Sequence, residues 1–394
     1  MIRLLVVAAL ALLSWITYVD RAAISSVKDP ISAELALDDR SMGAVFSAFA
    51  LGYAIGQIPT GWAADRFGPR LLLTAAVTIW SLLTGLTGLV HSLASLIAVR
   101  FLFGLAEAGA YPGTARAFYS WLPASEHGRA NGIVFAAARV GAALAFPMMA
   151  WLLEHRSWRH TFYLLAIPGL IWAALWFAFF RDKPVSSEPS APALSLREAF
   201  RTTAYRLTLL QYFAANFTTF LCLSWMNPYL KQRYSLSVAE AASYTMVPLL
   251  VGATAQWISG YSVDRLFTSR FRPVSRAIPA TVGFAISALG ALSIPFAQSA
   301  PAATMCFALA AFGAEVTISP SWAFCIDLGG KNSGSISGAM NTAGNFGSFV
   351  SANAFPWIQT WAGTANPYFF LLCGMNLLSA LAWSRMRSPQ SAKS

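Results

Sequence analysis

The chain has 394 residues, of which 57% are hydrophobic and only 11% are charged. Soluble globular proteins carry about 25% charged residues, so this composition excludes a soluble protein and indicates an integral membrane protein. The formal net charge of +11 lies in short loops between apolar segments, which indicates membrane orientation rather than a nucleic-acid partner.

Apolar segments long enough to cross a bilayer as helices recur along the whole chain. This pattern predicts an all-α membrane protein and differs from the weak alternation of a β-barrel. Twelve spans are predicted, at residues 2–26, 41–64, 70–90, 93–118, 129–153, 160–180, 205–230, 238–263, 275–298, 301–325, 333–357 and 365–384.

One long polar interval, rich in proline and serine, separates the sixth span from the seventh. Its composition is typical of a linker. We therefore predict an N-terminal six-helix bundle at 1–180, a cytoplasmic linker at 181–204 and a C-terminal six-helix bundle at 205–394. The first apolar segment imitates a signal peptide, but the spans that follow favour an uncleaved first helix.

The basic residues are distributed unequally between the two sides of the membrane. If both termini are cytoplasmic, eighteen Lys and Arg residues lie on that side and six on the other, with three more within or near spans. This asymmetry follows the positive-inside rule. It predicts that both termini face the cytoplasm.

The fourth span carries two opposite charges within an apolar run, Arg100 and Glu107. Seven residues at about 100° each return to nearly the same helix face, so both side chains point from one face, roughly 10 Å apart. Charges at bilayer depth usually face a bundle interior and mark a substrate or ion path. The alternative is an ion pair that only holds helices together.

Two further acids, Asp20 and Glu315, also lie at membrane depth. Burial and a nearby arginine shift a carboxyl pKa in opposite directions, so such acids can exchange protons near physiological pH. Glu315 has no arginine nearby in sequence, and a helix contact is its alternative role.

Two further arginines, Arg21 and Arg139, lie near or within spans. A guanidinium binds a carboxylate through two hydrogen bonds, which makes Arg21 the best anchor for an anionic substrate. Arg139 could bind a second carboxylate or could neutralise Glu107 or Glu315, and the sequence leaves both readings open.

Two similar loops follow the second and eighth spans, GWAADRFGPR at Gly61–Arg70 and GYSVDRL at Gly260–Leu266. A constant offset of 199 residues relates the matching positions, which predicts a parallel duplication of a six-helix unit. The matching residues are Gly61, Asp65 and Arg66 in the first loop and Gly260, Asp264 and Arg265 in the second.

The four cysteines and four histidines show no metal-site spacing, and no GxxxxGK phosphate loop is present. No nucleophile–base constellation is present either. We therefore expect no metal, no cofactor and no enzymatic activity.

Twelve spans in two repeats, with GxxxDRxGxR after the second, resemble the major facilitator superfamily. The resemblance implies two six-helix bundles related by a pseudo-twofold axis, a monomer, and a plasma-membrane location (the inner membrane of a bacterium). It also implies that the loop latches the cytoplasmic ends of the bundles, with Asp65 accepting hydrogen bonds. Positive-inside charge alone does not explain the acidic residue and the glycines.

Four stretches in both halves resemble the anion:cation symporter branch: YVDR (Tyr18–Arg21), GYAIGQIPTG (Gly52–Gly61), RFLFGLAEAGAYPG (Arg100–Gly113) and SGAMNTAGNFGS (Ser337–Ser348). The resemblance implies import of an organic anion, of hexonate, hexuronate or aldarate type, by proton symport with alternating access. It assigns proton coupling to Asp20, Glu107 and Arg100. It places Tyr18, Tyr53, Trp322 and Asn341 in the substrate cavity, with Asn345 a weaker candidate.

Other readings remain open at this point. Within transport, the chain could be an anion exchanger, an aromatic or dicarboxylate carrier, or a drug-efflux antiporter, although three intramembrane arginines disfavour cationic drugs. A receptor or scaffold is the alternative outside transport.

Overall fold

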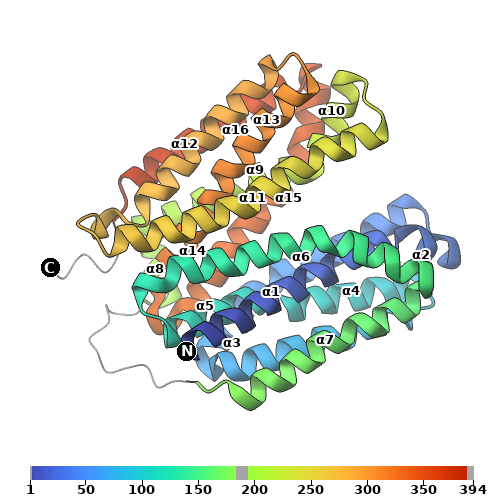
Figure 1. The fold of residues 1–394 in the computed structure, drawn as a ribbon, viewed down its shortest axis with the longest axis horizontal. Coiled ribbons are helices and arrows are strands. Elements are labelled where there is room, and N and C mark those ends of the chain that lie inside the picture. The colour runs from blue at the N-terminus through green and yellow to red at the C-terminus, as the bar shows by residue number, and fades with distance from the viewer. Residues whose placement is uncertain (1, 183–193, 388–394) are drawn as a thin grey trace. The chain divides into compact units, whose positions relative to one another are not determined.

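The computed structural model describes residues 2–182 and 194–387, which are helical and contain no strand (Figure 1). The α-helices within these residues are α1 (Ile2–Ser26), α2 (Lys28–Leu35), α3 (Asp39–Thr87), α4 (Leu93–Glu107), α5 (Ala110–Trp121), α6 (His127–His155), α7 (Trp158–Phe179), α8 (Leu196–Arg201), α9 (Thr203–Ser224), α10 (Met226–Tyr234), α11 (Val238–Phe267), α12 (Ala277–Ser293), α13 (Ala300–Val316), α14 (Ile318–Gly329), α15 (Ser333–Ala362) and α16 (Asn366–Ser384). Short 3-10 helices are η1 (Ala124–Glu126), η2 (Arg272–Val274), η3 (Ile294–Phe296) and η4 (Gly330–Asn332).

Each of the twelve predicted spans is helical. Within the described residues, eight helical stretches are long and apolar enough to cross a membrane, or nine with the bent pair of α9 and α10. Two of these stretches, Arg40–Thr87 and Ala300–Ala362, each contain two predicted spans. The remaining span, predicted at 238–263, is α11.

Breaks occur both between and within the predicted spans. Within α3, Gly68 has φ of 81° and precedes Pro69, so the chain turns there between the second and third spans. The fourth span divides at Ala108 and Gly109 into α4 and α5, and the tenth divides at Thr317 into α13 and α14.

The chain forms two compact units. Unit 1 comprises Met1–Leu122, Ala137–Ala193 and Gly329–Ala339, and unit 2 comprises Pro123–Ala136, Leu194–Leu328 and Met340–Ser394. Each unit thus takes a short segment from the other half of the sequence. Residues 183–193 of the predicted linker lie outside the described residues, and the part of the linker that follows them contains α8.

In unit 1, α3 packs against α4, α5 and α7 (Figure 1). Small residues permit this close approach: a Cβ at Gly56 would lie 2.8 Å from the backbone oxygen of Leu105. Lipid tails are as apolar as leucine, so close packing of backbones, rather than removal of apolar surface from water, holds such helices together.

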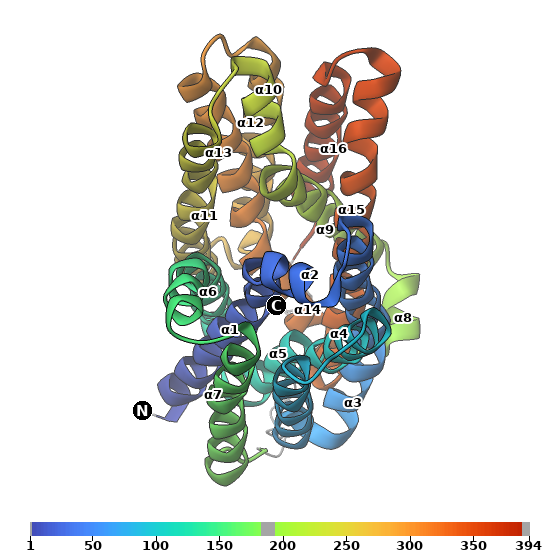
Figure 2. The same ribbon diagram turned by 90° about the vertical axis from the view of Figure 1, so that its right-hand side faces the viewer.

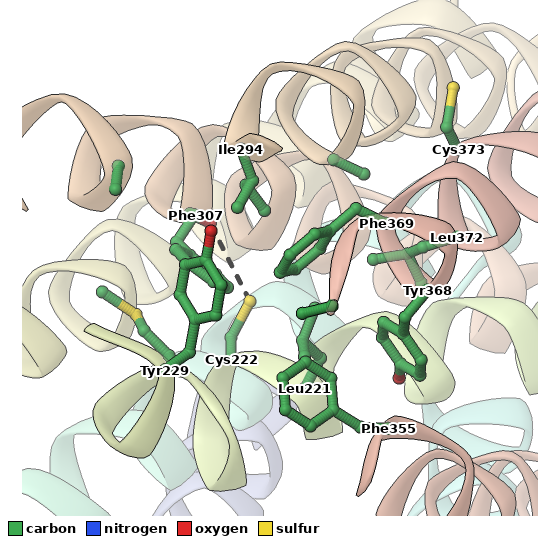
Figure 3. Packing of buried hydrophobic residues seen from close by; sticks show 14 of the residues in the cluster. Leu221, Cys222, Tyr229, Ile294, Phe307, Phe355, Tyr368, Phe369, Leu372 and Cys373 are labelled. Carbon is green, nitrogen blue, oxygen red and sulfur yellow. Dashed lines mark hydrogen bonds between the residues drawn. The ribbon is translucent and has the colours of Figure 1, made fainter. Parts of the chain in front are cut away.

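In unit 2, α13 lies beside both α11 and α12, and α12 also packs against α16 (Figure 1 and Figure 2). Aromatic rings fill the core near α9 and α10, where Phe307 and Phe369 have ring centres 5.9 Å apart (Figure 3). The hydroxyl of Tyr368 lies 2.7 Å from Ser351 Oγ, so the polar end of this ring is satisfied within the core. The four cysteines are unbridged, and three of them are buried.

Candidate functional site

The centre of the predicted site is an ion pair between the first and fourth spans. Arg21 of α1 donates from Nε to Oε1 of Glu107, the last residue of α4. Glu107 is fully buried. The second carboxylate oxygen of Glu107 and Nη2 of Arg21 are also buried and have no hydrogen-bond partner in the described part of the chain. The pair therefore retains one donor and one acceptor that a ligand can use.

Aromatic rings surround the guanidinium of Arg21. It lies 4.4 Å from the ring centre of Tyr53, 5.2 Å from Tyr18 and 5.4 Å from Phe49. Such rings attract a cation through their faces and exclude water from it. They strengthen any electrostatic interaction that an anion makes there.

Asp20 and Arg100 are also buried in this region, at 3% and 2% exposure. Arg100 interacts electrostatically with both Asp20 and Glu107. Its guanidinium lies 5.2 Å from the ring centre of Phe49, the ring that Arg21 also faces. Oδ2 of Asp20 and Nε of Arg100 are buried without a hydrogen-bond partner among the described residues, so both side chains are incompletely satisfied.

One contact at these charges was not anticipated from the sequence. Arg21, predicted as the substrate anchor, binds Glu107, which was predicted to act in proton coupling. Residues 86 positions apart on different helices make this contact, so periodicity within one helix could not reveal it.

Arg139 of α6 joins this cluster through Tyr18. Its guanidinium lies 5.9 Å from the ring centre of Tyr18, whose ring is also near Arg21. Another tyrosine that sequence reasoning passed over, Tyr111, lies 3.0 Å from Ser14 Oγ through its hydroxyl. Unit 1 thus brings together seven of the predicted residues: Tyr18, Asp20, Arg21, Tyr53, Arg100, Glu107 and Arg139.

The remaining predicted cavity residues belong to unit 2. Trp322 is buried and donates from Nε1 to the hydroxyl of Tyr212 at 2.8 Å, and its ring lies 5.5 Å from that of Phe135. Asn341 is buried, and its backbone oxygen accepts from Nδ2 of Asn345. Asn345 thus bonds within its own helix. Tyr212 gave no signal in the sequence.

Glu315 lies next to the break in the tenth span. Gln256 of α11 donates from Nε2 to the carboxylate of Glu315 at 2.7 Å and to its backbone oxygen at 3.1 Å. The amide oxygen of Gln256 in turn accepts from Ser319 Oγ. Gln256 thus connects both the side chain and the backbone of Glu315 to α11 and to Ser319.

The first loop motif contacts the beginning of α15. Asp65 accepts hydrogen bonds from the backbone N–H groups of Gly334 and Ser335, at 2.8 and 2.7 Å, and from Ser335 Oγ. A carboxylate at a helix N-terminus satisfies N–H groups that have no partner within the helix. A Cβ at Gly61 would lie 2.5 Å from the backbone oxygen of Gly334, which explains the glycine of the motif.

The second loop motif makes the same kind of contact in unit 2. Asp264 accepts from the backbone N–H groups of Gly128 and Arg129, both at 2.8 Å, at the beginning of α6. A Cβ at Gly260 would lie 2.6 Å from the backbone oxygen of Gly128. The sequence repeat is therefore accompanied by a repeated contact, although its partners, the first turns of α15 and α6, were not predicted.

The arginines of the two motifs lie apart from these carboxylate contacts. Arg66 faces Trp62 at 5.2 Å, and Arg265 donates to the hydroxyl of Tyr261 at 3.0 Å. Other basic groups lie nearer the carboxylates. Arg116 lies 3.9 Å from Asp65, and the buried Arg276 lies 3.9 Å from Asp264.

The described residues contain no group of three or more His, Cys, Asp or Glu side chains that could hold a metal ion. The predicted site residues are arginines, carboxylates, and aromatic and amide groups. Side chains of these kinds can bind anions and exchange protons.

Comparison with known proteins adds independent evidence. The profile of the Major Facilitator Superfamily matches residues 10–352. A probable sulfoacetate transporter of Cupriavidus necator is 31% identical over 96% of this chain and 93% of its own length. A hexuronate transporter of Bacillus subtilis is 29% identical over 98% of this chain and 95% of its own length.

Solved structures share the fold. The fucose:proton symporter of E. coli aligns with a TM-score of 0.77 and 14% identity, over 97% of this chain and 98% of that protein. A human organic anion transporter aligns with a TM-score of 0.76 and 17% identity, over 96% of this chain and 98% of that protein.

Proposed function

Because the chain belongs to the Major Facilitator Superfamily, we propose that it imports an organic anion of the sugar-acid type by proton symport with alternating access. Curated relatives that match nearly its full length are transporters of hexuronate, of galactonate and, with "probable" in their names, of galactarate and glucarate. They are transporters rather than enzymes.

The observation that carries the proposal is the Arg21–Glu107 pair. In the described structure Glu107 forms an ion pair with Arg21. Arg21 is the group best suited to bind a substrate carboxylate. A proton on Glu107 removes that competing charge, and Arg21 can then bind the incoming carboxylate. Proton binding and anion binding are thereby linked, since each favours the other.

Asp20 and Arg100 supply the second step of the proposed mechanism. Arg100 interacts with both acids, so protonation of Glu107 leaves Arg100 to Asp20 alone. This change in the partners of Arg100 can couple proton binding at Glu107 to a conformational change in the rest of unit 1. We propose that Asp20 exchanges its partnership with Arg100 as the cavity changes the side on which it opens.

The polar part of a sugar acid needs partners that donate and accept. Tyr18, Tyr53, Trp322 and Asn341 offer hydroxyl, indole and amide groups, and we propose that they bind the polyol chain. The indole N–H of Trp322 already bonds to Tyr212, so Tyr212 is added to this set.

We propose that the Asp65 and Asp264 contacts act as latches in the transport cycle. Each carboxylate accepts from consecutive backbone N–H groups at the start of a helix. Such contacts are strong when formed and are lost together when the helices separate by a few ångströms. The glycines at Gly61 and Gly260 let the helices approach closely enough to form them.

The same residues also support a second candidate, anion exchange without net proton movement. Arg21 can bind an external or an internal anion in turn. Glu107 then serves only to compensate the positive charge of Arg21 while no anion is bound. Efflux of organic cations is disfavoured by the three arginines of the site.

The proposal includes a plasma-membrane location, the inner membrane in a bacterium, with both termini in the cytoplasm. It also includes a monomer with bundles at 1–180 and 205–394 joined by the linker at 181–204.

The test is uptake into proteoliposomes that contain the purified protein, with an imposed inward proton gradient. The panel holds hexonates, hexuronates, aldarates and sulfoacetate, and protein-free liposomes are the control. Proton symport predicts accumulation of at least one anion that collapses when a protonophore dissipates the gradient. Uptake that requires an internal anion and ignores the proton gradient would instead identify an exchanger.

A further inference from the structure

Unit 2 contains a groove that the transport site does not use. It has a volume of about 620 Å³ and lies between α11 and α12, with α13 at its side. Its apolar part is lined by Ile258, Val282, Ile286 and Phe312. Ile258 and Val282 are about half exposed. Exposed apolar side chains on membrane helices face lipid tails rather than water, so the groove is suited to an acyl chain.

One end of the groove is polar and basic. Tyr261, Arg265 and Ser269 line it, and Arg265 is the only charged lining residue. Arg265 is exposed, and its Nη1 donates to the hydroxyl of Tyr261. This end is the one that the distribution of basic residues predicts to be cytoplasmic.

The loop that follows α11 adds further positive charge beside this end. Arg270 and Arg272 are exposed, and their guanidinium groups lie over Phe271 and Phe267 at 4.9 and 4.8 Å. The acid next to Arg265 in sequence is Asp264, which is buried and bonded to the start of α6. Three arginines thus stand at or near the mouth of the groove, while Glu126 lines the adjoining pocket on the other side of Tyr261 and Arg265.

We propose that this groove binds an anionic phospholipid, with one acyl chain along α11 and α12 and the phosphate at Arg265. An apolar groove alone accepts any lipid, and basic residues at the interface alone attract any anion. The combination of an apolar channel that ends at an arginine selects a molecule with both parts. Basic pockets between membrane helices on the cytoplasmic side are suited to anionic headgroups.

The proposal does not depend on the transported substrate, because the groove lies outside the Arg21 cluster. The probe is phosphatidylglycerol, compared with phosphatidylcholine of the same acyl chains. Binding to the detergent-purified protein is measured by native mass spectrometry and by the shift in thermal unfolding. We expect at least about fivefold preference for phosphatidylglycerol, which is ~1 kcal/mol for one basic residue near an anionic headgroup.

Two variants test the two parts of the groove. Arg265→Gln should remove the preference for phosphatidylglycerol while leaving weak binding of both lipids. Val282→Trp should fill the apolar part and reduce the binding of both. Leu289→Trp is the matched control, because Leu289 is exposed on the same helix outside the groove lining, and it should bind both lipids as the unmodified protein does.

Three results would overturn the proposal. One is an unchanged preference for phosphatidylglycerol in Arg265→Gln together with unchanged binding of both lipids in Val282→Trp. Another is an equal loss in Leu289→Trp, which would mean that the lipid acts on the helix surface in general. The third is a shift in thermal unfolding with water-soluble glycerol phosphate that is as large as the shift with phosphatidylglycerol. This result would identify a site for free anions rather than for a lipid.

Discussion

At the scale of single residues, the proposed mechanism depends on competition for Arg21. A buried guanidinium needs a counter-charge, and Glu107 provides it in the described structure. In the proposed mechanism a substrate carboxylate replaces Glu107, so the binding energy of the substrate is the difference between two similar interactions. Small changes at either residue should therefore alter affinity strongly, because neither group is stable alone in an apolar environment.

Replacement of Arg21 tests the anchor. Arg21→Ala should abolish anion binding, and Arg21→Lys should weaken it severely because an ammonium group cannot form the paired hydrogen bonds of a guanidinium. The expected loss for Arg21→Lys is ~1.5–3 kcal/mol, about tenfold to a hundredfold in Kd. Isothermal titration calorimetry on the purified variants measures it. Binding that survives Arg21→Ala would place the substrate site elsewhere.

Arg139 is the residue to replace in order to test whether the site recognises a second acidic group. The guanidinium carbons of Arg21 and Arg139 lie 5.2 and 5.9 Å from the same ring centre, that of Tyr18, and are therefore at most 11.1 Å apart. If Arg139 binds a second carboxylate, Arg139→Gln should weaken aldarate binding about tenfold or more, the loss expected for one charged hydrogen bond, and should leave hexonate binding nearly unchanged. Equal losses for both substrates would show that Arg139 only balances charge.

At the scale of helices, glycine positions determine where the elements meet. Gly61 and Gly260 each stand where another backbone crosses closely. Within unit 1, the packing of α3 against the start of α15 therefore requires that residue 61 have no side chain. One turn later in α3, Asp65 caps the N-terminus of α15. Packing and capping are adjacent because both require the same close approach.

Two glycines of α3 form a matched pair for testing this point. A Cβ at Gly61 would meet the backbone oxygen of Gly334 at 2.5 Å, whereas a Cβ at Gly43 would meet nothing within 4 Å. Gly61→Ala should therefore lower the thermal unfolding temperature in detergent. Gly43→Ala should leave it unchanged or raise it, because alanine favours a helix over glycine by about 1 kcal/mol. If the two variants unfold alike, close packing at Gly61 contributes no stability.

The sequence predicted helices well and contacts between them poorly. Hydrophobic length located all twelve spans, because a span needs about 20 apolar residues regardless of its neighbours. The shared face of Arg100 and Glu107 followed from helix periodicity. The Arg21–Glu107, Glu315–Gln256 and Trp322–Tyr212 contacts did not, because each joins residues on different helices. Gly68 and Pro69 indicated a break in sequence, but Thr317 gave no comparable signal.

At the scale of the whole molecule, proton coupling needs two properties at once. The proton must alter the affinity for the substrate. In addition, the carrier must not change the side on which it opens when only the proton or only the substrate is bound. The Arg21–Glu107 pair can supply the first property, since a proton on Glu107 frees Arg21. The second property requires that the conformational change of the carrier depend on whether Glu107 is protonated and substrate is bound. We attribute this dependence to Asp20 and Arg100.

Glu107→Gln and Asp20→Asn separate these two properties. Glutamine imitates the protonated acid, so Glu107→Gln should retain anion binding and counterflow exchange but lose accumulation driven by a proton gradient. Asp20→Asn should likewise uncouple, because Arg100 then lacks its second acid at every pH. Counterflow and gradient-driven uptake are measured in the same proteoliposomes, so that misfolded protein, which fails in both assays, is distinguished from an uncoupled carrier. If Glu107→Gln still concentrates substrate on an inward proton gradient, the proton binds elsewhere. Glu315, buried beside the break in the tenth span and bonded to Gln256, is then the residue to replace next.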